Sequence, residues 1–353
     1  MPEISKKVSI DYILFISISL LFLLSVIVLR SIAPSIFPLY YLYFVLSILV
    51  FFLFLAIDFE IISLFSTHIY WGSIILLLLP LLIGQVTRGA VRWIPIGPLS
   101  IQPAEIVRPF LLVFFANYLT EKSLDIKRLA KALFLFALPL FLIVIAPSFG
   151  VAVLTTLGFI GVVLASGLNR KYLLTSIAIV FIAMPLGWKL LAPYQRSRVF
   201  SFLNPSADPL GAGYNSIQSM VSVGSGMLAG RGLGKGVQTQ LAFLPEKHTD
   251  FIFAAVSEEL GFIGATIVIL GLFVIFWRLI IIIESARSFA ARAFVSGLFL
   301  TLFIETLIHI GMNLGLLPIT GVPLPLVSAG GSSLLATMIG LGIALGSQKP
   351  SVA

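Results

Sequence analysis

The sequence predicts an all-α polytopic membrane protein of about ten transmembrane helices, with both termini cytoplasmic and one large extracytoplasmic loop between helices 7 and 8. Of its 353 residues, 59% are hydrophobic and only 10% are charged, and the mean hydropathy is +1.13. Soluble domains carry about a quarter charged residues, so a water-soluble enzyme is excluded. Apolar stretches of membrane-spanning length recur from end to end, and residues 1–353 therefore form a single membrane domain.

Each expected helix satisfies a requirement of about 20 mostly apolar residues, or fewer where polar groups face protein. The first apolar run follows Lys6 and Lys7; it is too long for a signal-peptide core and lacks a small-residue cleavage site, so it stays as a helix. A polar interval at about 192–250 separates the seventh run from the eighth. The runs lie near residues 12–30, 37–57, 69–84, 104–119, 132–146, 151–168, 172–191, 251–277, 293–314 and 330–346.

Basic residues in the short loops predict the orientation of these helices. With the N-terminus inside, the inner loops collect Lys122, Lys127, Arg128, Lys131, Arg170, Lys171, Arg278, Arg287, Arg292 and Lys349. The short outer loop near residues 31–36 has only Arg30 at its edge. Positive charge accumulates on the cytoplasmic side of membrane proteins, so both termini are expected to be cytoplasmic.

Charge and cysteine content exclude several classes of function. The 22 basic and 14 acidic residues give a net charge of +8, too small and too scattered for a nucleic-acid surface, so a membrane or an anionic ligand is the better partner. The absence of cysteine excludes disulfides, thiolate metal sites and a cysteine nucleophile. The histidines, His68, His248 and His309, are widely separated and show no metal-binding pattern.

The long outer interval contains a glycine-rich stretch, GSGMLAGRGLGKG, at residues 224–236. A phosphate-binding loop ending at Gly234 and Lys235 would need glycine where Ala229 stands and serine or threonine where Gly236 stands. A nucleotide-binding loop is therefore rejected. The alternative is a glycine-rich turn that packs against other helices.

A charged cluster, Glu246, Lys247, His248 and Asp250, comes directly before the apolar run that begins at Phe251. One interpretation is structural: Thr249 or Asp250 caps the following helix and the other charges are solvated. The other is catalytic, because a carboxylate at the membrane surface can take a proton from a hydroxyl while nearby cations hold an anionic leaving group. Arg196 and Arg198 lie in the same outer interval.

Two further sets of polar residues fall inside predicted helices. Glu105 and Arg108 are three residues apart and share a helix face, so they either pair with each other or Arg108 binds a phosphate group. Glu305, His309 and Asn313 recur every four residues and form a polar stripe. We expect this stripe to make hydrogen bonds between helices rather than to catalyse a reaction.

Several long strings resemble the SEDS family (shape, elongation, division and sporulation) of peptidoglycan glycosyltransferases, which FtsW and RodA represent. They are GAVRWIPIGPLSIQPAEI at 89–106, NPSADPLGAGYNSIQS at 204–219, LPEKHTDFIFAAVSEELG at 244–261 and GLLPITGVPLPLVSAGGSS at 315–333. The resemblance covers most of the chain from Gly89 onward. It implies a ten-helix fold and polymerisation of lipid II, an undecaprenyl-pyrophosphate-linked disaccharide pentapeptide, at the outer leaflet of the bacterial cytoplasmic membrane.

The resemblance also implies a mechanism. Asp250, in the HTDFIF string, is the expected catalytic residue, and acts as general base toward the 4-hydroxyl of the acceptor sugar in an inverting displacement that releases lipid pyrophosphate. A class B penicillin-binding protein, a transpeptidase, is the expected partner. The resemblance assigns no cofactor, and a requirement for a divalent cation stays open. The residues expected to bind lipid II or the undecaprenyl-linked glycan are Arg92, Trp93, Gln102, Glu105, Arg108, Arg196, Arg198, Glu246, Lys247, Ser328 and Ser332.

Some positions depart from the family pattern. Arg108 replaces a lysine, Ser148 replaces an aspartate, and Ala104 and Ala329 replace a serine and a tyrosine. Two alternatives to an active polymerase therefore stay open: a lipid II flippase that uses the intramembrane charges, and a catalytically silent scaffold for a transpeptidase. The GRGLGKGVQ stretch, residues 230–238, favours the FtsW-like branch over the RodA-like one.

Overall fold

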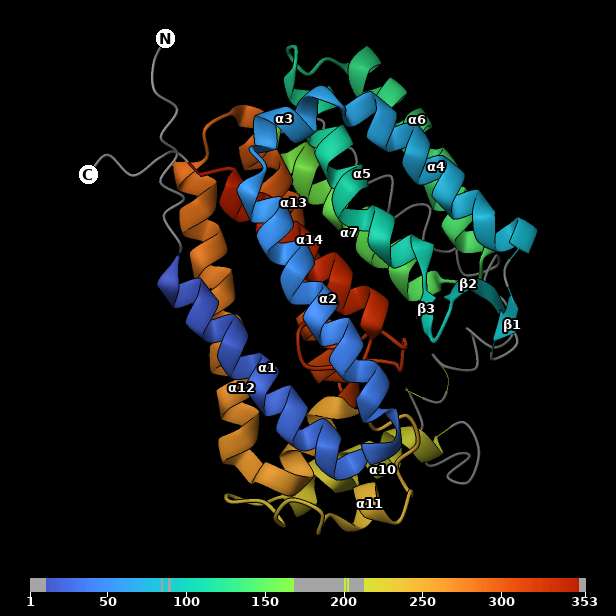
Figure 1. The fold of residues 1–353 in the computed structure, drawn as a ribbon, viewed down its shortest axis with the longest axis vertical. Helices are drawn as coiled ribbons and strands as arrows, with labels where there is room; N and C mark the ends of the chain where they lie inside the picture. Colours follow the sequence, from blue (N-terminus) through green and yellow to red (C-terminus); the bar gives the residue numbers. More distant parts are fainter. Residues whose placement is uncertain are drawn as a thin grey trace.

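The computed structural model describes residues 11–83, 85–87, 90–167, 200, 202 and 213–348. Within this part the chain is built mainly of long helices that run side by side (Figure 1). The long helices are α1 (Tyr12–Ile32), α2 (Phe37–Ala56), α4 (Ser66–Ile83), α5 (Pro103–Thr120), α6 (Ile126–Ile145), α7 (Phe149–Ala165), α12 (Ile252–Ser285), α13 (Phe289–Asn313) and α14 (Gly331–Gly346). The short ones are η1 (Pro34–Ile36), α3 (Phe59–Leu64), α10 (Tyr214–Ser225) and α11 (Val237–Gln240).

The long helices confirm the predicted polytopic membrane fold. Six helical segments of the described residues are long and apolar enough to cross a membrane, and α7 and α14 are shorter apolar helices. The expected helix near 172–191 lies outside the described residues, as do Lys6, Lys7, Arg170, Lys171 and Lys349.

Polar residues mark where several of these helices begin. Asp11 accepts a hydrogen bond from the amide of Leu14 at 3.1 Å and caps α1. Ser288 accepts one from Ala291 at 3.1 Å at the start of α13. Each side chain satisfies an amide that the first turn of a helix leaves without a partner, so the apolar run that follows starts its helix at that point.

The helices pack through small residues as well as large ones. α2 packs on α14, α7 on α13, α1 on α12 and α4 on α5. Between α7 and α13, a Cβ added to Gly161 would lie 2.9 Å from the Cα of Gly297. Glycine at this contact lets two backbones approach closely, which is how membrane helices gain packing energy where lipid is as apolar as protein.

The two ends of the described chain lie at the same end of the helix bundle. Asp11, at the start of α1, pairs with Arg278 near the end of α12 at 2.6 Å. Gln348, just after α14, forms a β-bridge with Ala286. This is the arrangement expected if both termini lie on one side of the membrane.

A small sheet is the one departure from the all-α expectation in the described residues. Strands β1 (Gln85–Thr87), β2 (Ala90–Ile96) and β3 (Leu99–Ile101) form an antiparallel sheet in the order β1-β2-β3. Gly97, with φ of +61°, begins the two-residue turn between β2 and β3. Glycine at this position of a tight hairpin turn was the sequence signal that the helix-based prediction missed.

The glycine-rich stretch packs against a break in α12, which confirms the structural interpretation of those glycines. Gly261 interrupts the helix with φ of +68° and ψ of −161°. The amides of Phe262 and Ile263, freed by the break, donate to the carbonyls of Met227 and Leu228 at 2.8 and 3.2 Å. Irregular backbone is tolerated at membrane depth only where such partners exist, so the stretch and the break depend on each other.

Candidate functional site

A cavity of about 390 Å³ lies at the end of the bundle where α5, α7 and α14 begin. It is the point where segments far apart in sequence meet: strand β2, the starts of these three helices, the turn before α12 and the loop before α14. Its lining includes six of the predicted site residues, Arg92, Trp93, Gln102, Glu105, Asp250 and Ser332. Arg108, Glu246, Lys247 and Ser328 do not line it. Arg196 and Arg198 lie outside the described residues.

The sheet positions the basic and aromatic residues of this cavity. Arg92 and Trp93 lie in β2, which pairs with β1 through Trp93 and Gln85. The Nη1 atom of Arg92 lies 3.5 Å from the carbonyl oxygen of Pro147, which precedes α7. Arg92 therefore holds its guanidinium near the start of α7 while still lining the cavity.

Asp250 lies in a tight turn before α12 rather than in the helix itself. The carbonyl of Glu246 accepts the amides of Thr249, Asp250 and Phe251 at 3.1, 3.1 and 3.3 Å. The N-cap residue of α12 is Phe251, so the structural interpretation, in which Thr249 or Asp250 is the N-cap residue, is wrong. The Asp250 side chain lines the cavity instead.

The cap of α12 comes from another helix. The Oδ1 atom of Asn313, the last residue of α13, accepts the amide of Ala254 at 3.0 Å. Its Nδ2 donates to the carbonyls of Asp250 at 3.0 Å and His309 at 2.8 Å. The polar stripe of Glu305, His309 and Asn313 thus makes the contacts between segments that its spacing predicted.

The loop before α14 is fastened to the turn that holds Asp250. Ser328 donates from Oγ to the carbonyl of Thr249 and accepts the amide of Leu324, both at 2.8 Å. The amide of Ala329 donates to the carbonyl of His248 at 2.9 Å. Ser328 is buried, so it holds the two loops together rather than facing the cavity.

Ser148, which replaces the aspartate of the family pattern, lines the cavity and is hydrogen-bonded there. The Nε2 atom of Gln102 donates to its Oγ at 3.0 Å, and that Oγ donates to the carbonyl of Ala146 at 2.9 Å. The backbone amide of Gln102 donates to the Oγ of Ser332 at 2.8 Å. A neutral hydroxyl at 148 therefore completes a chain of hydrogen bonds across the starts of α5, α7 and α14.

A buried ionic cluster lies beneath the cavity. The Nη2 atom of Arg108 is 3.3 Å from Oε2 of Glu105 and 3.2 Å from Oε2 of Glu305 on α13. All three residues are buried, and of the three only Glu105 lines the cavity. This geometry favours the ion-pair interpretation of Arg108 over direct phosphate binding, and the sequence did not indicate that Glu305 is a second partner of Arg108.

Lys247 contacts α11 and does not line the cavity. Its Nζ donates to the carbonyl of Thr239, at the end of α11. Burial lowers the pKa of the Lys247 ammonium, and the charges of Glu259 and Glu258 act in the opposite direction. Lys247 therefore connects the turn that holds Asp250 to α11.

The cavity combines groups suited to acid–base chemistry on an anionic substrate. Asp250 and Glu105 supply carboxylates, Arg92 supplies a cation, and Trp93 supplies an aromatic face. Among the described residues, no three His, Asp or Glu side chains are grouped closely enough to hold a metal ion. The set fits a base and an anion-binding group facing one bound molecule.

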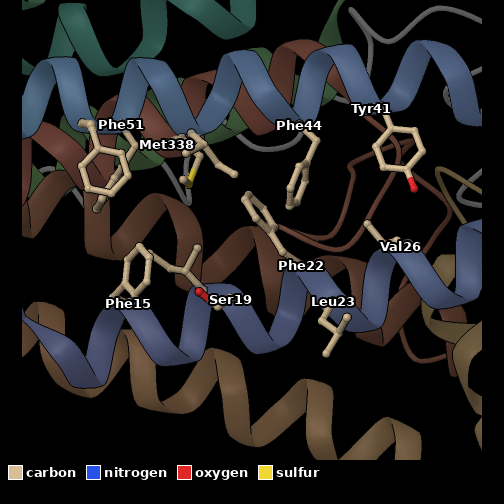
Figure 2. Close-up of a pocket in the computed structure, with 12 residues that line it drawn as sticks. Phe15, Ser19, Phe22, Leu23, Val26, Tyr41, Phe44, Phe51 and Met338 are labelled. Atoms are coloured by element: carbon tan, nitrogen blue, oxygen red, sulfur yellow. The ribbon is translucent and has the colours of Figure 1, made fainter.

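A second hollow, of about 370 Å³, is apolar and shares no lining residue with the first. Figure 2 shows it between α1 and α2, with Met338 of α14 contributing to its wall. Phe22 and Phe44 meet across it with ring centroids 4.5 Å apart. Its lining contains no carboxylate or basic side chain, so the polar cavity is the candidate site for chemistry.

Comparison with known proteins places the chain among cell-wall enzymes. The FtsW/RodA/SpoVE family model, described as "Cell cycle protein", matches residues 7–349. Peptidoglycan glycosyltransferase MrdB of Escherichia coli K12 is 38% identical over 79% of this chain and 76% of its own length. Probable peptidoglycan glycosyltransferase FtsW of Buchnera aphidicola (strain Bp) is 38% identical over 76% of this chain and 72% of its own.

Solved structures have the same fold. A chain from a structure described as "Structural coordination of polymerization and crosslinking by a peptidoglycan synthase complex" matches with a TM-score of 0.84 and 29% identity, over 96% of this chain and 97% of that one. The rod shape determining protein RodA of Thermus thermophilus matches with a TM-score of 0.71 and 25% identity, over 96% of both chains.

Proposed function

We propose that this chain, which belongs to the FtsW/RodA/SpoVE family, is a peptidoglycan glycosyltransferase that polymerises lipid II. The observation that carries the proposal is the convergence of Asp250, Glu105, Arg92 and Trp93 on one cavity, on a fold shared with a chain of a peptidoglycan synthase complex. The chain is a multi-pass membrane protein. We place it in the bacterial cytoplasmic membrane with the cavity on the outer face.

Asp250 is the proposed general base. It accepts the proton of the acceptor 4-hydroxyl as that oxygen attacks the anomeric carbon of the donor sugar. The bond from that carbon to the lipid pyrophosphate breaks, and the pyrophosphate leaves with the bonding electrons. An α-linked donor that gives a β-linked product inverts in this single step. Arg92 stabilises the charge that grows on the pyrophosphate.

A class B penicillin-binding protein is the proposed partner. The matching synthase complex couples polymerisation with crosslinking. In the same way, we expect this chain to polymerise the glycan and a separate transpeptidase to crosslink it. Two measurements test this partnership: whether the chain copurifies with such a protein, and whether its polymerisation rate changes when the two are combined.

The experiment that tests the function uses purified full-length protein and labelled lipid II, with and without the transpeptidase, and measures glycan chains. Asp250→Asn should reduce polymerisation by at least about 10²-fold, because the amide keeps the size of the side chain but cannot accept the proton. Lipid II binding should persist. Glu60→Gln removes an exposed carboxylate on α3 and is the matched control, with activity unchanged. Normal synthesis by folded Asp250→Asn protein would overturn the assignment.

A further inference from the structure

We infer that Asn313 is a positioning residue for Asp250, an inference that rests on the proposed function. Asn313 is the last residue of α13 and is completely buried. Its side chain contacts both sides of the point where α12 begins: the carbonyl of Asp250 before the helix and the amide of Ala254 in its first turn. Asn313 is 63 residues from Asp250 in sequence, so the bond joins two separate elements.

The three bonds of Asn313 engage both the oxygen and the NH₂ group of its side chain in one orientation. Oδ1 accepts from an amide in the first turn of α12, and Nδ2 donates to two carbonyls, those of Asp250 and His309. An asparagine flipped about its last torsion would turn its NH₂ toward a donor and its oxygen toward two acceptors. The orientation of the side chain is therefore set by its partners, and it fixes them in return.

This arrangement determines where the Asp250 carboxylate lies. Asp250 is outside the helix, in a turn, and the first turn of a helix frays when its amides lack acceptors. Asn313 supplies that acceptor and also holds the Asp250 backbone against α13. The base is thereby fixed relative to α13.

A general base must be held closely, since a displacement of about 1 Å can reduce a rate by about 10²-fold. Asn313→Ala removes all three side-chain bonds and leaves the chemical identity of every cavity-lining residue unchanged. We expect kcat for lipid II polymerisation to fall at least about 10-fold. KM for lipid II should stay within about twofold, because Asn313 does not line the cavity. A purely structural residue would not separate kcat from KM in this way.

Ser219→Ala is the matched control. It removes a buried hydroxyl that contacts the backbone of the same residue, but leaves the side-chain bonds of Asn313 intact. Its kcat should stay within about twofold of wild type. If Asn313→Ala does not fold, Asn313→Ser, which keeps one donor and one acceptor, replaces it. Full kcat in the folded Asn313 variant, or an equal loss of kcat in Ser219→Ala, would overturn the inference.

Hydrogen–deuterium exchange separates this inference from the proposed function. In Asn313→Ala, faster exchange should be confined to the peptide that covers residues 249–256, with the rest of α12 unchanged. If wild-type protein does not polymerise lipid II, the function is wrong, and this exchange pattern still decides whether Asn313 holds the segment. Unchanged exchange there would overturn the positioning role whatever the activity.

Discussion

Replacing Arg108 tests the interpretation of the buried cluster beneath the cavity. Its Nη2 atom alone lies within 3.3 Å of both carboxylates, one from Glu105 and one from Glu305. Arg108→Gln removes the cation and leaves two buried carboxyl groups facing a neutral amide. Arg108→Lys keeps a positive nitrogen that can sit between the same two oxygens, because both contacts use a single guanidinium nitrogen.

The structure gives the size of the effect. Arg108 is 3% exposed and Glu305 is fully buried, so neither is relieved by water when its partner is lost. Breaking a buried ion pair by removing one partner costs about 3–5 kcal/mol. We expect Arg108→Gln to lose stability in that range. Arg108→Lys should lose much less, with lipid II KM unchanged, because Arg108 does not line the cavity.

Denaturant unfolding followed by tryptophan fluorescence, in one detergent for all variants, measures these differences. Lipid II polymerisation measured in parallel gives kcat and KM. A stable Arg108→Gln protein with a strongly raised KM for lipid II would refute the ion-pair reasoning and restore Arg108 as a ligand of the substrate.

Two other perturbations test the contacts of α12 and of the turn that precedes it. In thermal unfolding, Gly261→Ala should destabilise the protein by about 1–3 kcal/mol or more, because φ at this position is +68° and the added Cβ would lie 2.3 Å from the amide nitrogen of Gly230. Gly72→Ala is the control: a Cβ there would meet nothing within 4 Å, so this variant should be neutral or slightly stabilising in the same assay. Burial holds the pKa of Lys247 in the folded protein below its usual 10.5, so between the folded and unfolded pKa the unfolded chain binds more protons. The free energy of unfolding of wild type relative to Lys247→Gln should therefore rise as pH increases through that window. A difference that does not change with pH would contradict this reasoning.

The sequence predicted the helices well because hydrophobic runs and their caps are local signals. Nine of the ten predicted spans have a counterpart in the described residues, usually within a few positions. The main boundary error is in α12, predicted to end near 277 and observed to continue to Ser285. Arg278 was expected in an inner loop, whereas it lies within α12 and pairs with Asp11.

The site was predicted in part. Arg92, Trp93 and Asp250 stand in strings specific enough to be recognised, and they do line one cavity. The partners that hold them were not predictable, because each contact joins residues far apart in sequence. The bond from Asn313 to the Asp250 carbonyl spans 63 residues, and the pair of Arg108 with Glu305 spans 197. Helical spacing placed these side chains on a face but did not say which segment that face meets.

Glu305, the second carboxylate partner of Arg108, also decides how charge rescue should be tested. From sequence alone, Glu105→Gln combined with Arg108→Gln is the natural rescue of Arg108→Gln. In the structure that double variant leaves the carboxyl group of Glu305 fully buried without a cation, whereas the side chain at position 105 lines the cavity. Arg108→Gln with Glu305→Gln should therefore recover more of the lost stability, about 3–5 kcal/mol, than Arg108→Gln with Glu105→Gln. The reverse order in denaturant unfolding would show that Glu105, and not Glu305, is the carboxyl group whose charge Arg108 compensates.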